Sequence, residues 1–323
     1  MTMNSKPTVL VTRRLPQAVE QRLQRDYDAR LNTHDEVYSS DQLLELASGA
    51  TAIIPCHTER LNADVIARLP ASVRAICSFS VGYDHIDLAA AKKRGILVTN
   101  TPDVLSNATA EIAILLMLGA ARRAHEGART LRSNTWADWS AIGQLGIEVT
   151  GKRLGIIGMG RVGLVMAQRA RGFDMEIHYY NRHRLSPDLE AGAVFHEDLR
   201  DLLPQSQFLS IHCPATPQTH HLLNAERIAL LPDDAVVVNT ARGAVVDDDA
   251  LIAALTSGKL FAAGLDVFNG EPNIDPRYRE LDNTFLLPHI GSATRETRDA
   301  MGFRALDNLD AIMAGHEPGD RLA

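Results

Sequence analysis

Short runs of β-branched residues alternate with amphipathic segments along almost the whole chain of 323 residues. From residue 7 to about residue 100, apolar runs such as TVLV and AIIP are separated by segments of helical periodicity, for example residues 16–25 and 62–69. A second series of this kind runs from KRLGIIG to TFLLPHI. Strands that alternate with helices form parallel sheets covered on both faces. We therefore expect an α/β protein with two doubly wound parallel-sheet domains.

An Ala/Leu-rich segment, from about Asn107 to Arg132, separates the two series. Its apolar residues follow helical periodicity over several turns, which predicts one long helix that connects the two lobes and serves as a hinge. The residues from Ser292 onward predict a terminal helix and a polar tail. This tail segment is too short for a domain of its own and must pack on one of the two lobes.

Composition and charge exclude several classes of protein. The formal charge of −7 comes without a block of Lys and Arg, which argues against nucleic acid and anionic membranes as partners. Three cysteines without CxxC spacing (Cys56, Cys77 and Cys213) indicate neither a disulfide framework nor a metal site, and favour a reducing cytoplasm. The longest apolar stretch, at residues 112–118, is shorter than the roughly 20 residues of a membrane span.

The most specific local motif is Gly158-Met-Gly160-Arg-Val-Gly163, which follows the apolar run LGII and precedes a helical pattern. In a dinucleotide site the first glycine permits a tight turn, the second lets the backbone approach the pyrophosphate, and the third allows close helix packing. The phosphates then bind N–H groups at the start of the helix, here at Arg161 and Val162. A glycine-rich turn in another βα protein is the alternative.

The end of the second strand of this motif indicates the choice of cofactor. An NAD enzyme places an Asp or Glu there to bind the ribose 2′-hydroxyl, whereas this chain has Asn181-Arg182-His183-Arg184. A neutral Asn beside two guanidinium groups suits a 2′-phosphate, because arginine forms bidentate, charge-assisted hydrogen bonds with it. We predict that NADPH is preferred over NADH. The alternative is that Arg182 and Arg184 are ordinary surface residues.

Three later segments each place a reactive side chain just beyond an apolar strand: Arg242 in NTARG, Glu271 in NGEP and His289 in LPHIG. The carboxyl ends of parallel strands converge on one crevice, so these residues can share a site. Reduction of a ketone by hydride requires a proton donor, and histidine suits that role near neutral pH. His289 is the candidate acid, Glu271 can orient its ring, and Arg242 can hold a substrate carboxylate. Taken singly, each residue could be structural.

These motifs occur in the order found in the D-isomer-specific 2-hydroxyacid dehydrogenases, and the chain resembles that family over nearly its whole length. The resemblance implies that Arg242, Glu271 and His289 form the catalytic triad. It also implies that the backbone amides of Val81 and Gly82, in SFSVGYDHID, bind the substrate carboxylate. The further residues that it assigns to the cofactor are Thr109, Cys213, Pro214, Thr219, Thr240, Ala241, Asp266 and Gly291.

Within the family, SVGYDHID, TPDVLSNATAE and the NRHR segment are most similar to glyoxylate/hydroxypyruvate reductases and their 2-ketogluconate reductase relatives. In these reductases the loop that carries Trp136 and Trp139 reaches the partner subunit and narrows its substrate pocket, which implies a homodimer with Trp139 at the partner's substrate site. Local packing at the hinge is the alternative for both tryptophans. Tyr83 departs from the smaller aliphatic residue of many relatives, so substrate size is not carried over.

The resemblance also sets the expected domain boundaries. A discontinuous, flavodoxin-like substrate-binding domain comprises residues 1–101 and 291–323, and a Rossmann dinucleotide-binding domain comprises residues 102–290. Two other functions are possible on the same fold. One is a cofactor-sensing corepressor that captures peptides, and the other is an NAD-dependent formate or phosphite dehydrogenase, although the neutral residue at position 181 argues against NAD.

Overall fold

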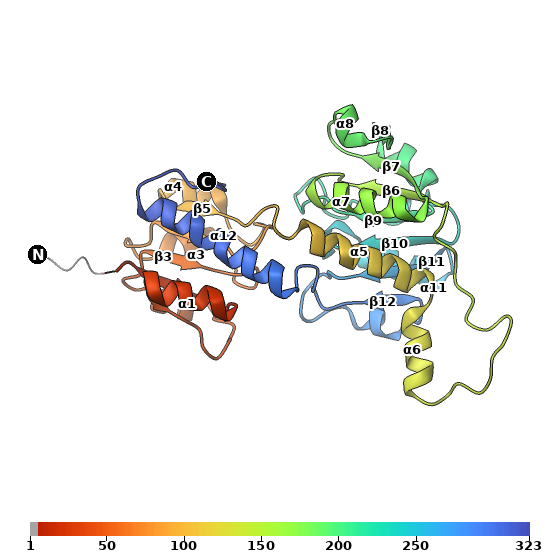
Figure 1. Cartoon of the computed structure of the whole chain (residues 1–323), viewed down its shortest axis with the longest axis horizontal. Coiled ribbons are helices and arrows are strands. Elements are labelled where there is room, and N and C mark those ends of the chain that lie inside the picture. Colours follow the sequence, from red (N-terminus) through yellow and green to blue (C-terminus); the bar gives the residue numbers. More distant parts are fainter. Residues whose placement is uncertain (1–5) are drawn as a thin grey trace, which may run out of the picture. The chain divides into compact units, whose positions relative to one another are not determined.

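The computed structural model describes residues 6–323 (Figure 1). The chain forms two compact units. The first unit comprises the residues up to Leu105 together with Ser292–Ala323, and the second comprises Ser106–Gly291. Each unit is built on one parallel sheet with helices on both faces.

The first sheet has the strand order β2-β1-β3-β4-β5, which is the order of a flavodoxin-like doubly wound sheet. Its strands are β1 (Thr8–Val11), β2 (Asp28–Arg30), β3 (Ala52–Ile54), β4 (Ala75–Cys77) and β5 (Leu97–Thr99). The helices of this unit are α1 (Gln17–Asp26), α2 (Ser40–Leu46), α3 (Ala63–Arg68), α4 (Leu88–Lys93) and α12 (Arg295–Met313).

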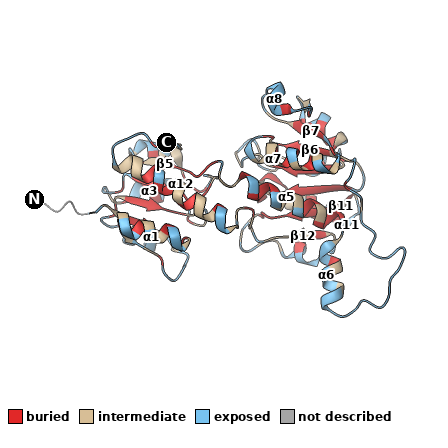
Figure 2. Cartoon of the chain, viewed as in Figure 1, coloured by how far each residue is buried: buried red, intermediate tan, exposed pale blue. Residues whose placement is uncertain are grey.

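Each face of the first sheet has its own apolar core, because successive residues of a strand point to opposite faces. In β3, Ile53 packs with residues of α2, α3 and α4, whereas Ile54 packs with residues of α1 and α12. Figure 2 shows the buried strands between partly exposed helices. Helix α12 contacts α1 and β4, and the amide of Leu322 donates to the carbonyl of Val98 at 2.7 Å, so the end of the chain extends the first unit.

The second sheet has the order β12-β11-β10-β9-β6-β7-β8. Its strands are β6 (Arg153–Ile157), β7 (Glu176–Tyr180), β8 (Val194–His196), β9 (Phe208–Ile211), β10 (Ala235–Asn239), β11 (Leu260–Leu265) and β12 (Thr284–Leu286). The strand order reverses between β6 and β9, as in a Rossmann fold. These two parallel sheets confirm the predicted fold class.

The helices of the second unit cover both faces of its sheet. They are α5 (Ser106–Ala121), α6 (Ala124–Arg132), α7 (Arg161–Ala170), α8 (Pro187–Glu190), α9 (Leu199–Leu202), α10 (Ala225–Ile228) and α11 (Asp248–Thr256), with short 3-10 helices η1 (Arg171–Phe173), η2 (Leu203–Gln205), η3 (Gly243–Val245) and η4 (Pro276–Glu280). The interior strand β10 is buried on both faces: Val237 contributes to one core, and Val236 and Val238 to the other.

The prediction of one helix from about Asn107 to Arg132 is wrong. Helix α5 ends at Ala121 and α6 begins at Ala124, because Arg123 between them adopts a left-handed backbone conformation (φ 52°). The guanidinium of Arg123 then pairs with the carboxylate of Glu126, with 2.9 Å between Nε and Oε2. Helix α5 packs along α7, β10 and β11 within the second unit.

Four short elements have no clear sequence pattern: β2, α2, β8 and α8. The strands β2 and β8 are the edges of their sheets and are mostly polar or exposed, so they lack the alternation of a half-buried strand. Helix α2 buries only Leu43, and α8 buries only Glu190. These elements are therefore held by their neighbours rather than by an apolar stripe of their own.

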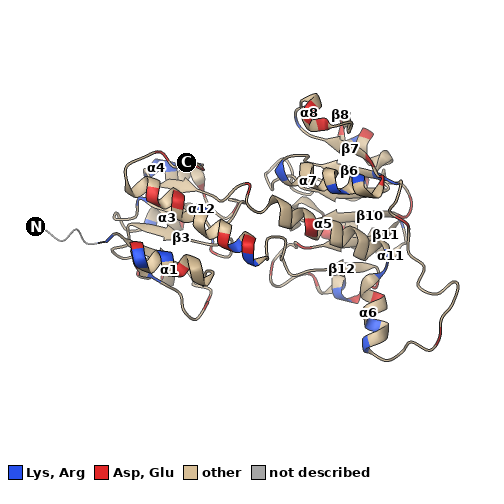
Figure 3. Cartoon of the chain, viewed as in Figure 1, with Lys and Arg blue, Asp and Glu red and all other residues tan. Residues whose placement is uncertain are grey.

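Acidic and basic residues are interspersed along the helices of both units (Figure 3). Among the residues that the structure describes, no helix is both long enough and apolar enough to cross a membrane.

Candidate active site

The glycine motif forms the turn between β6 and α7. A Cβ at Gly158, where φ is +90°, would lie 2.6 Å from the amide nitrogen of Cys213, and a Cβ at Gly163 would lie 2.5 Å from the carbonyl oxygen of Gly158. A Cβ at Gly160 would meet no atom within 4 Å. Two of the glycines are therefore required by packing, whereas Gly160 faces open space.

This open space lies at the N-terminus of α7. The N-cap residue is Gly160, which has no side chain that could cover the free N–H groups of the helix. The N–H groups of a first helical turn have no partner inside the helix and attract anions. A bare backbone that faces open space at a helix start fits a pyrophosphate. The turn therefore has the form that a dinucleotide requires.

The side chain of Asn181, just after β7, is hydrogen bonded to this turn. Its Oδ1 accepts from the amide of Met159 at 2.7 Å, and its Nδ2 donates to the Met159 carbonyl at 3.3 Å. Asn181 therefore braces the glycine turn, a role that sequence reasoning did not foresee.

The two arginines near Asn181 are both exposed but differ in their partners. Arg184 forms a bidentate ion pair with Glu190, at 2.8 Å from Nε and 3.0 Å from Nη2. The hydroxyl of Tyr179 also donates to Glu190, at 2.6 Å. Arg184 and Tyr179 together hold the pKa of the Glu190 carboxyl below its usual range, with the arginine as the larger cause.

The loops after β9 and β10 contain the predicted residues Cys213, Pro214, Thr219, Thr240 and Ala241. The hydroxyl of Thr219 donates to the Pro214 carbonyl at 2.7 Å and so closes the first loop on itself.

His212 joins the two loops, because its ring is hydrogen bonded to Ser210 at 2.9 Å and to Thr240 at 3.1 Å. Burial lowers the pKa of His212 to about 4. Sequence reasoning missed this histidine, although its position directly before Cys213 is visible in the motif.

Asp266 follows β11 and holds the segment that comes directly after His289. Its two carboxylate oxygens accept from the amides of Ile290 and Gly291, each at 2.7 Å. Burial raises the pKa of Asp266 to about 6, although these two amides act in the opposite direction. A Cβ at Gly291 would lie 3.0 Å from Asp266 and 3.5 Å from the methyl group of Thr109, so these three predicted residues lie together.

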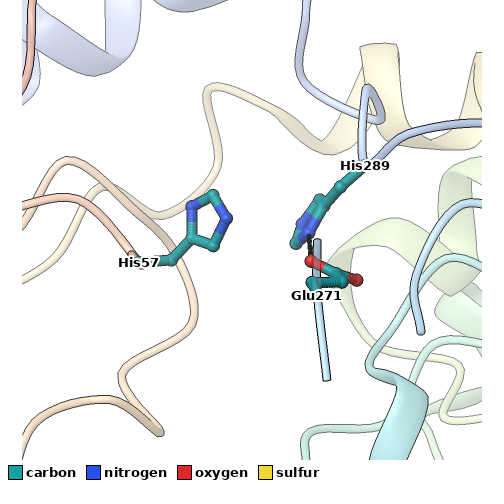
Figure 4. A group of neighbouring side chains, drawn as sticks. All are labelled: His57, Glu271 and His289. Atoms are coloured by element: carbon teal, nitrogen blue, oxygen red, sulfur yellow. Dashed lines mark hydrogen bonds and ion pairs between the residues drawn. The ribbon is translucent and has the colours of Figure 1, made fainter. Parts of the chain in front are cut away.

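His289 and Glu271 form a hydrogen-bonded pair, with 2.7 Å between Nδ1 and Oε2 (Figure 4). The other carboxylate oxygen of Glu271 accepts from the amide of Phe268 at 2.7 Å, which fixes the carboxylate. His289 adopts a left-handed backbone conformation (φ 53°), which non-glycine residues rarely adopt and which is common at functional sites. Because Nδ1 is held by Glu271, Nε2 is the ring nitrogen on the side of the imidazole away from that carboxylate.

Arg242 follows β10 in a turn fixed by the buried side chain of Asn239, which donates to the Arg242 carbonyl at 2.9 Å and accepts from the Ala241 amide at 2.9 Å. A Cβ at Gly243 would lie 2.1 Å from the carbonyl carbon of Phe268. The turn that carries Arg242 therefore packs backbone to backbone against the turn that carries Glu271. The structure thus places the loops of all three predicted catalytic residues at the carboxyl edge of the second sheet.

Val81 and Gly82 follow β4 in the first unit. The Val81 carbonyl accepts from Nδ2 of Asn100 at 2.8 Å, and the Gly82 carbonyl accepts from the hydroxyl of Ser80 at 2.7 Å. These bonds engage the two carbonyls and fix the segment that carries the amides of Val81 and Gly82. Ser80 and Asn100 were not predicted from the sequence, although both lie just beyond strand ends.

Residues 131–145 contain an unusual set of large apolar side chains that are mostly exposed. Trp139 is 80% exposed and Trp136 is 62% exposed, so neither side chain is packed into the local structure around it. Three further members of the set are Leu131, Ile142 and Leu145. Several large apolar side chains exposed within one short segment commonly mark an interaction site.

Comparison with known proteins places the chain in a family. Residues 114–291 match the family described as "D-isomer specific 2-hydroxyacid dehydrogenase, NAD binding domain". The chain belongs to this family of nicotinamide-dependent oxidoreductases. The family confirms the enzyme class expected from the sequence, and the second unit contains the nicotinamide dinucleotide-binding domain.

Close relatives match the dehydrogenase over nearly all of both chains. Glycerate dehydrogenase of Hyphomicrobium methylovorum is 44% identical over 99% of this chain and 100% of its own. Glyoxylate reductase of Pyrococcus horikoshii is 40% identical over 97% of this chain and 95% of its own. The structure of the NADPH-dependent glyoxylate/hydroxypyruvate reductase of Sinorhizobium meliloti, in complex with NADP and malonate, superimposes with a TM-score of 0.89 at 31% identity, over 99% and 97% of the two chains.

Proposed function

We propose that this dehydrogenase reduces a small 2-keto acid, such as glyoxylate, hydroxypyruvate or 2-ketogluconate, to the D-2-hydroxy acid and prefers NADPH to NADH. The observation that carries the proposal is the His289–Glu271 hydrogen bond at the carboxyl edge of the dinucleotide-binding sheet. A general acid oriented by a carboxylate is what ketone reduction requires. The names of the relatives support this substrate class.

His289 acts as the proton donor in the proposed mechanism. Glu271 accepts a hydrogen bond from Nδ1, so Nε2 of the imidazolium carries the proton that is given to the keto oxygen. The nicotinamide, when bound, supplies the hydride to the carbonyl carbon. Glu271 stabilises the charged ring before transfer, and its second oxygen stays fixed by the Phe268 amide.

Arg242 and the first unit bind the substrate in this proposal. The guanidinium of Arg242 matches a planar carboxylate and also polarises the keto oxygen. The amides of Val81 and Gly82 also donate to the substrate carboxylate. The carbonyls of the same two residues accept hydrogen bonds from Asn100 and Ser80. We therefore propose that the first unit is the substrate-binding domain and that the second unit, which also carries Arg242, is the dinucleotide-binding domain.

The preference for NADPH rests on the residues after β7. Asn181 offers no carboxylate that would repel a 2′-phosphate, and its side chain is engaged with Met159. Arg182 is exposed and is the principal donor to the phosphate, while Arg184 shares its charge with Glu190. The NADP complex of the Sinorhizobium meliloti reductase supports this cofactor for the fold.

The proposed assembly is a homodimer in which Trp139 contributes to the substrate site of the partner. The exposure of Trp139 and its apolar neighbours supports this assignment, because such side chains are normally covered in a stable protein. The three cysteines of the chain are free thiols, which suits the expected reducing cytoplasm.

The proposal is tested by the initial rates of NADPH and NADH oxidation, measured in parallel with glyoxylate and hydroxypyruvate. Faster consumption of NADPH with either acid supports both the chemistry and the role of Arg182. Equal rates with the two cofactors reject the cofactor preference alone. Binding of both cofactors without turnover of any keto acid rejects the reaction, and the corepressor alternative would then be tested by peptide capture.

A further inference from the structure

The first sheet has a topological switch point of its own, between β1 and β3. In open α/β sheets, ligands bind beyond the carboxyl ends of the strands at the position where the strand order reverses. The order β2-β1-β3-β4-β5 reverses at that pair. The loop after β3 contains Cys56, His57, Thr58 and Glu59, and the imidazole of His57 is exposed.

A buried carboxylate, that of Glu59, holds the residues before and after His57. Glu59 is only 2% exposed, and its oxygens accept from the amide of Cys56 at 2.8 Å and from the hydroxyl of Thr58 at 2.7 Å. A third donor, the hydroxyl of Thr12 after β1, lies 2.6 Å away. Burial of a carboxylate is unfavourable unless it is hydrogen bonded in this way. The arrangement holds the two residues on either side of an exposed histidine, one by its amide and the other by its hydroxyl.

The same loop is tied to the segment that contains Val81 and Gly82. Strands β3 and β4 pair in parallel, with Ile53 opposite Ile76, and the Phe79 amide continues this ladder by donating to the Pro55 carbonyl at 2.8 Å. His57 and Val81 each lie two residues beyond that last pair. The loop of His57 therefore lies next to the loop whose amides bind the substrate carboxylate in the proposed function.

We propose that His57 is a specificity-determining residue that hydrogen bonds a hydroxyl group on C3 of the substrate. A 2-keto acid is short, so a group that binds near its carboxylate end reaches C3 as well. An imidazole can donate to or accept from a hydroxyl, whereas it offers nothing to a methyl group. The inference rests on the proposed function and narrows its substrates to 3-hydroxy-2-keto acids, with hydroxypyruvate preferred over pyruvate.

The test compares kcat/KM for hydroxypyruvate and pyruvate in the wild type, His57→Leu and His57→Gln, with His316→Leu as the control because His316 is an exposed histidine after α12. Loss of one hydrogen bond in His57→Leu is expected to lower kcat/KM for hydroxypyruvate about tenfold and to leave pyruvate within about twofold. His57→Gln retains a donor and an acceptor and should recover part of the loss. Equal losses on both substrates would overturn the inference.

A second measurement separates this inference from the proposed reaction. Calorimetric titration of the NADP-saturated protein with D-glycerate and D-lactate reports the contact at C3 without turnover. A preference for D-glycerate in the wild type that disappears in His57→Leu supports the role of His57, even when no keto acid is reduced and the proposed function has failed. The same ratio of the two affinities in both proteins, or no binding of either acid, overturns it.

Discussion

The two sheets present their proposed binding groups in opposite ways. At the carboxyl edge of the first sheet the groups are the backbone amides of Val81 and Gly82, and polar side chains hold the peptides in place. At the carboxyl edge of the second sheet the groups are side chains, and close backbone packing at glycines holds the turns that carry them.

This difference determines what can be read from a sequence. A reactive side chain at a strand end is visible as a residue type, so Arg242, Glu271 and His289 stand out. An amide is present in almost every residue, so the first edge is visible only through a family resemblance. Substitutions should therefore damage the two edges differently: the second through its reactive side chains and its glycines, and the first through its buried polar supports.

The largest effect is expected from His289→Ala. Loss of a general acid should lower turnover by about 10²–10⁴-fold, while cofactor binding survives because the glycine turn is untouched. Single-turnover rates and the dissociation constant of NADPH measure the two quantities. Near-normal turnover would show that His289 is not the proton donor.

Two buried groups at the second edge should give the protein opposing responses to pH. Asp266 has a pKa of about 6 in the folded protein against 3.8 unfolded, so its stabilising contribution is present below pH 3.8 and is lost as the pH rises towards 6. His212 has a pKa of about 4 against 6.5, so its contribution is present above pH 6.5 and is lost as the pH falls towards 4. Each effect amounts to about 3 kcal/mol.

The variants Asp266→Asn and His212→Asn separate these two responses. Between pH 4 and 6, the unfolding free energy should increase with pH more steeply in Asp266→Asn than in the wild type, and should decrease in His212→Asn. Urea unfolding followed by far-UV circular dichroism measures both slopes. Identical slopes in all three proteins would show that neither group is titrated differently on folding.

Gly160→Ala tests whether the open side of the glycine turn is reserved for a ligand. A Cβ there meets no atom within 4 Å, so folding stability should stay close to that of the wild type. Cofactor affinity should fall by up to about a hundredfold, because the added methyl would occupy the space of the pyrophosphate. Gly172→Ala, also in open space, is the matched control and should affect neither quantity.

The arginines after β7 should contribute unequally. Arg182→Ala is expected to weaken NADPH binding about tenfold and NADH binding little, because only NADPH carries the 2′-phosphate. Arg184→Ala should have a smaller effect, since Glu190 already compensates that charge, and the double variant should resemble Arg182→Ala. An equal loss for both cofactors in the double variant would contradict the assignment.

The smallest effect is expected at the first edge, from Asn100→Ala. Loss of the side-chain hydrogen bond to the Val81 carbonyl should loosen the amide pair and raise KM for the keto acid about fivefold, with little change in kcat. Steady-state kinetics separates the two parameters. A fall in kcat comparable to that of His289→Ala would mean that the two edges do not differ as proposed.

The sequence predicts the architecture well, because the buried strands are apolar runs and the helices between them are amphipathic. The prediction fails for β2 and β8, which are edge strands without a regular apolar pattern. It also fails at Arg123, where the break in the helix depends on the backbone conformation of one residue. Sequence periodicity continues across that break, so it cannot reveal the separation of α5 from α6.

At the site, motif and spacing identify the groups that could carry chemistry but not the contacts that hold them. Asn181 was singled out because it is not an acid, yet its amide braces the glycine turn. The pairing of Arg184 with Glu190 and the bridge made by His212 depend on which strand ends are neighbours in space. Only the folded sheet provides that information.

The exposed tryptophans make the dehydrogenase its own optical probe. Trp136 and Trp139 are the two tryptophans of the chain, and both lie in the apolar segment of residues 131–145 rather than in a core. Excitation of indole therefore reports the polarity around this segment and hardly senses the packing of either sheet. Burial of the segment against a second copy would shift the emission to shorter wavelength as protein concentration rises, so subunit association can be followed without an attached dye.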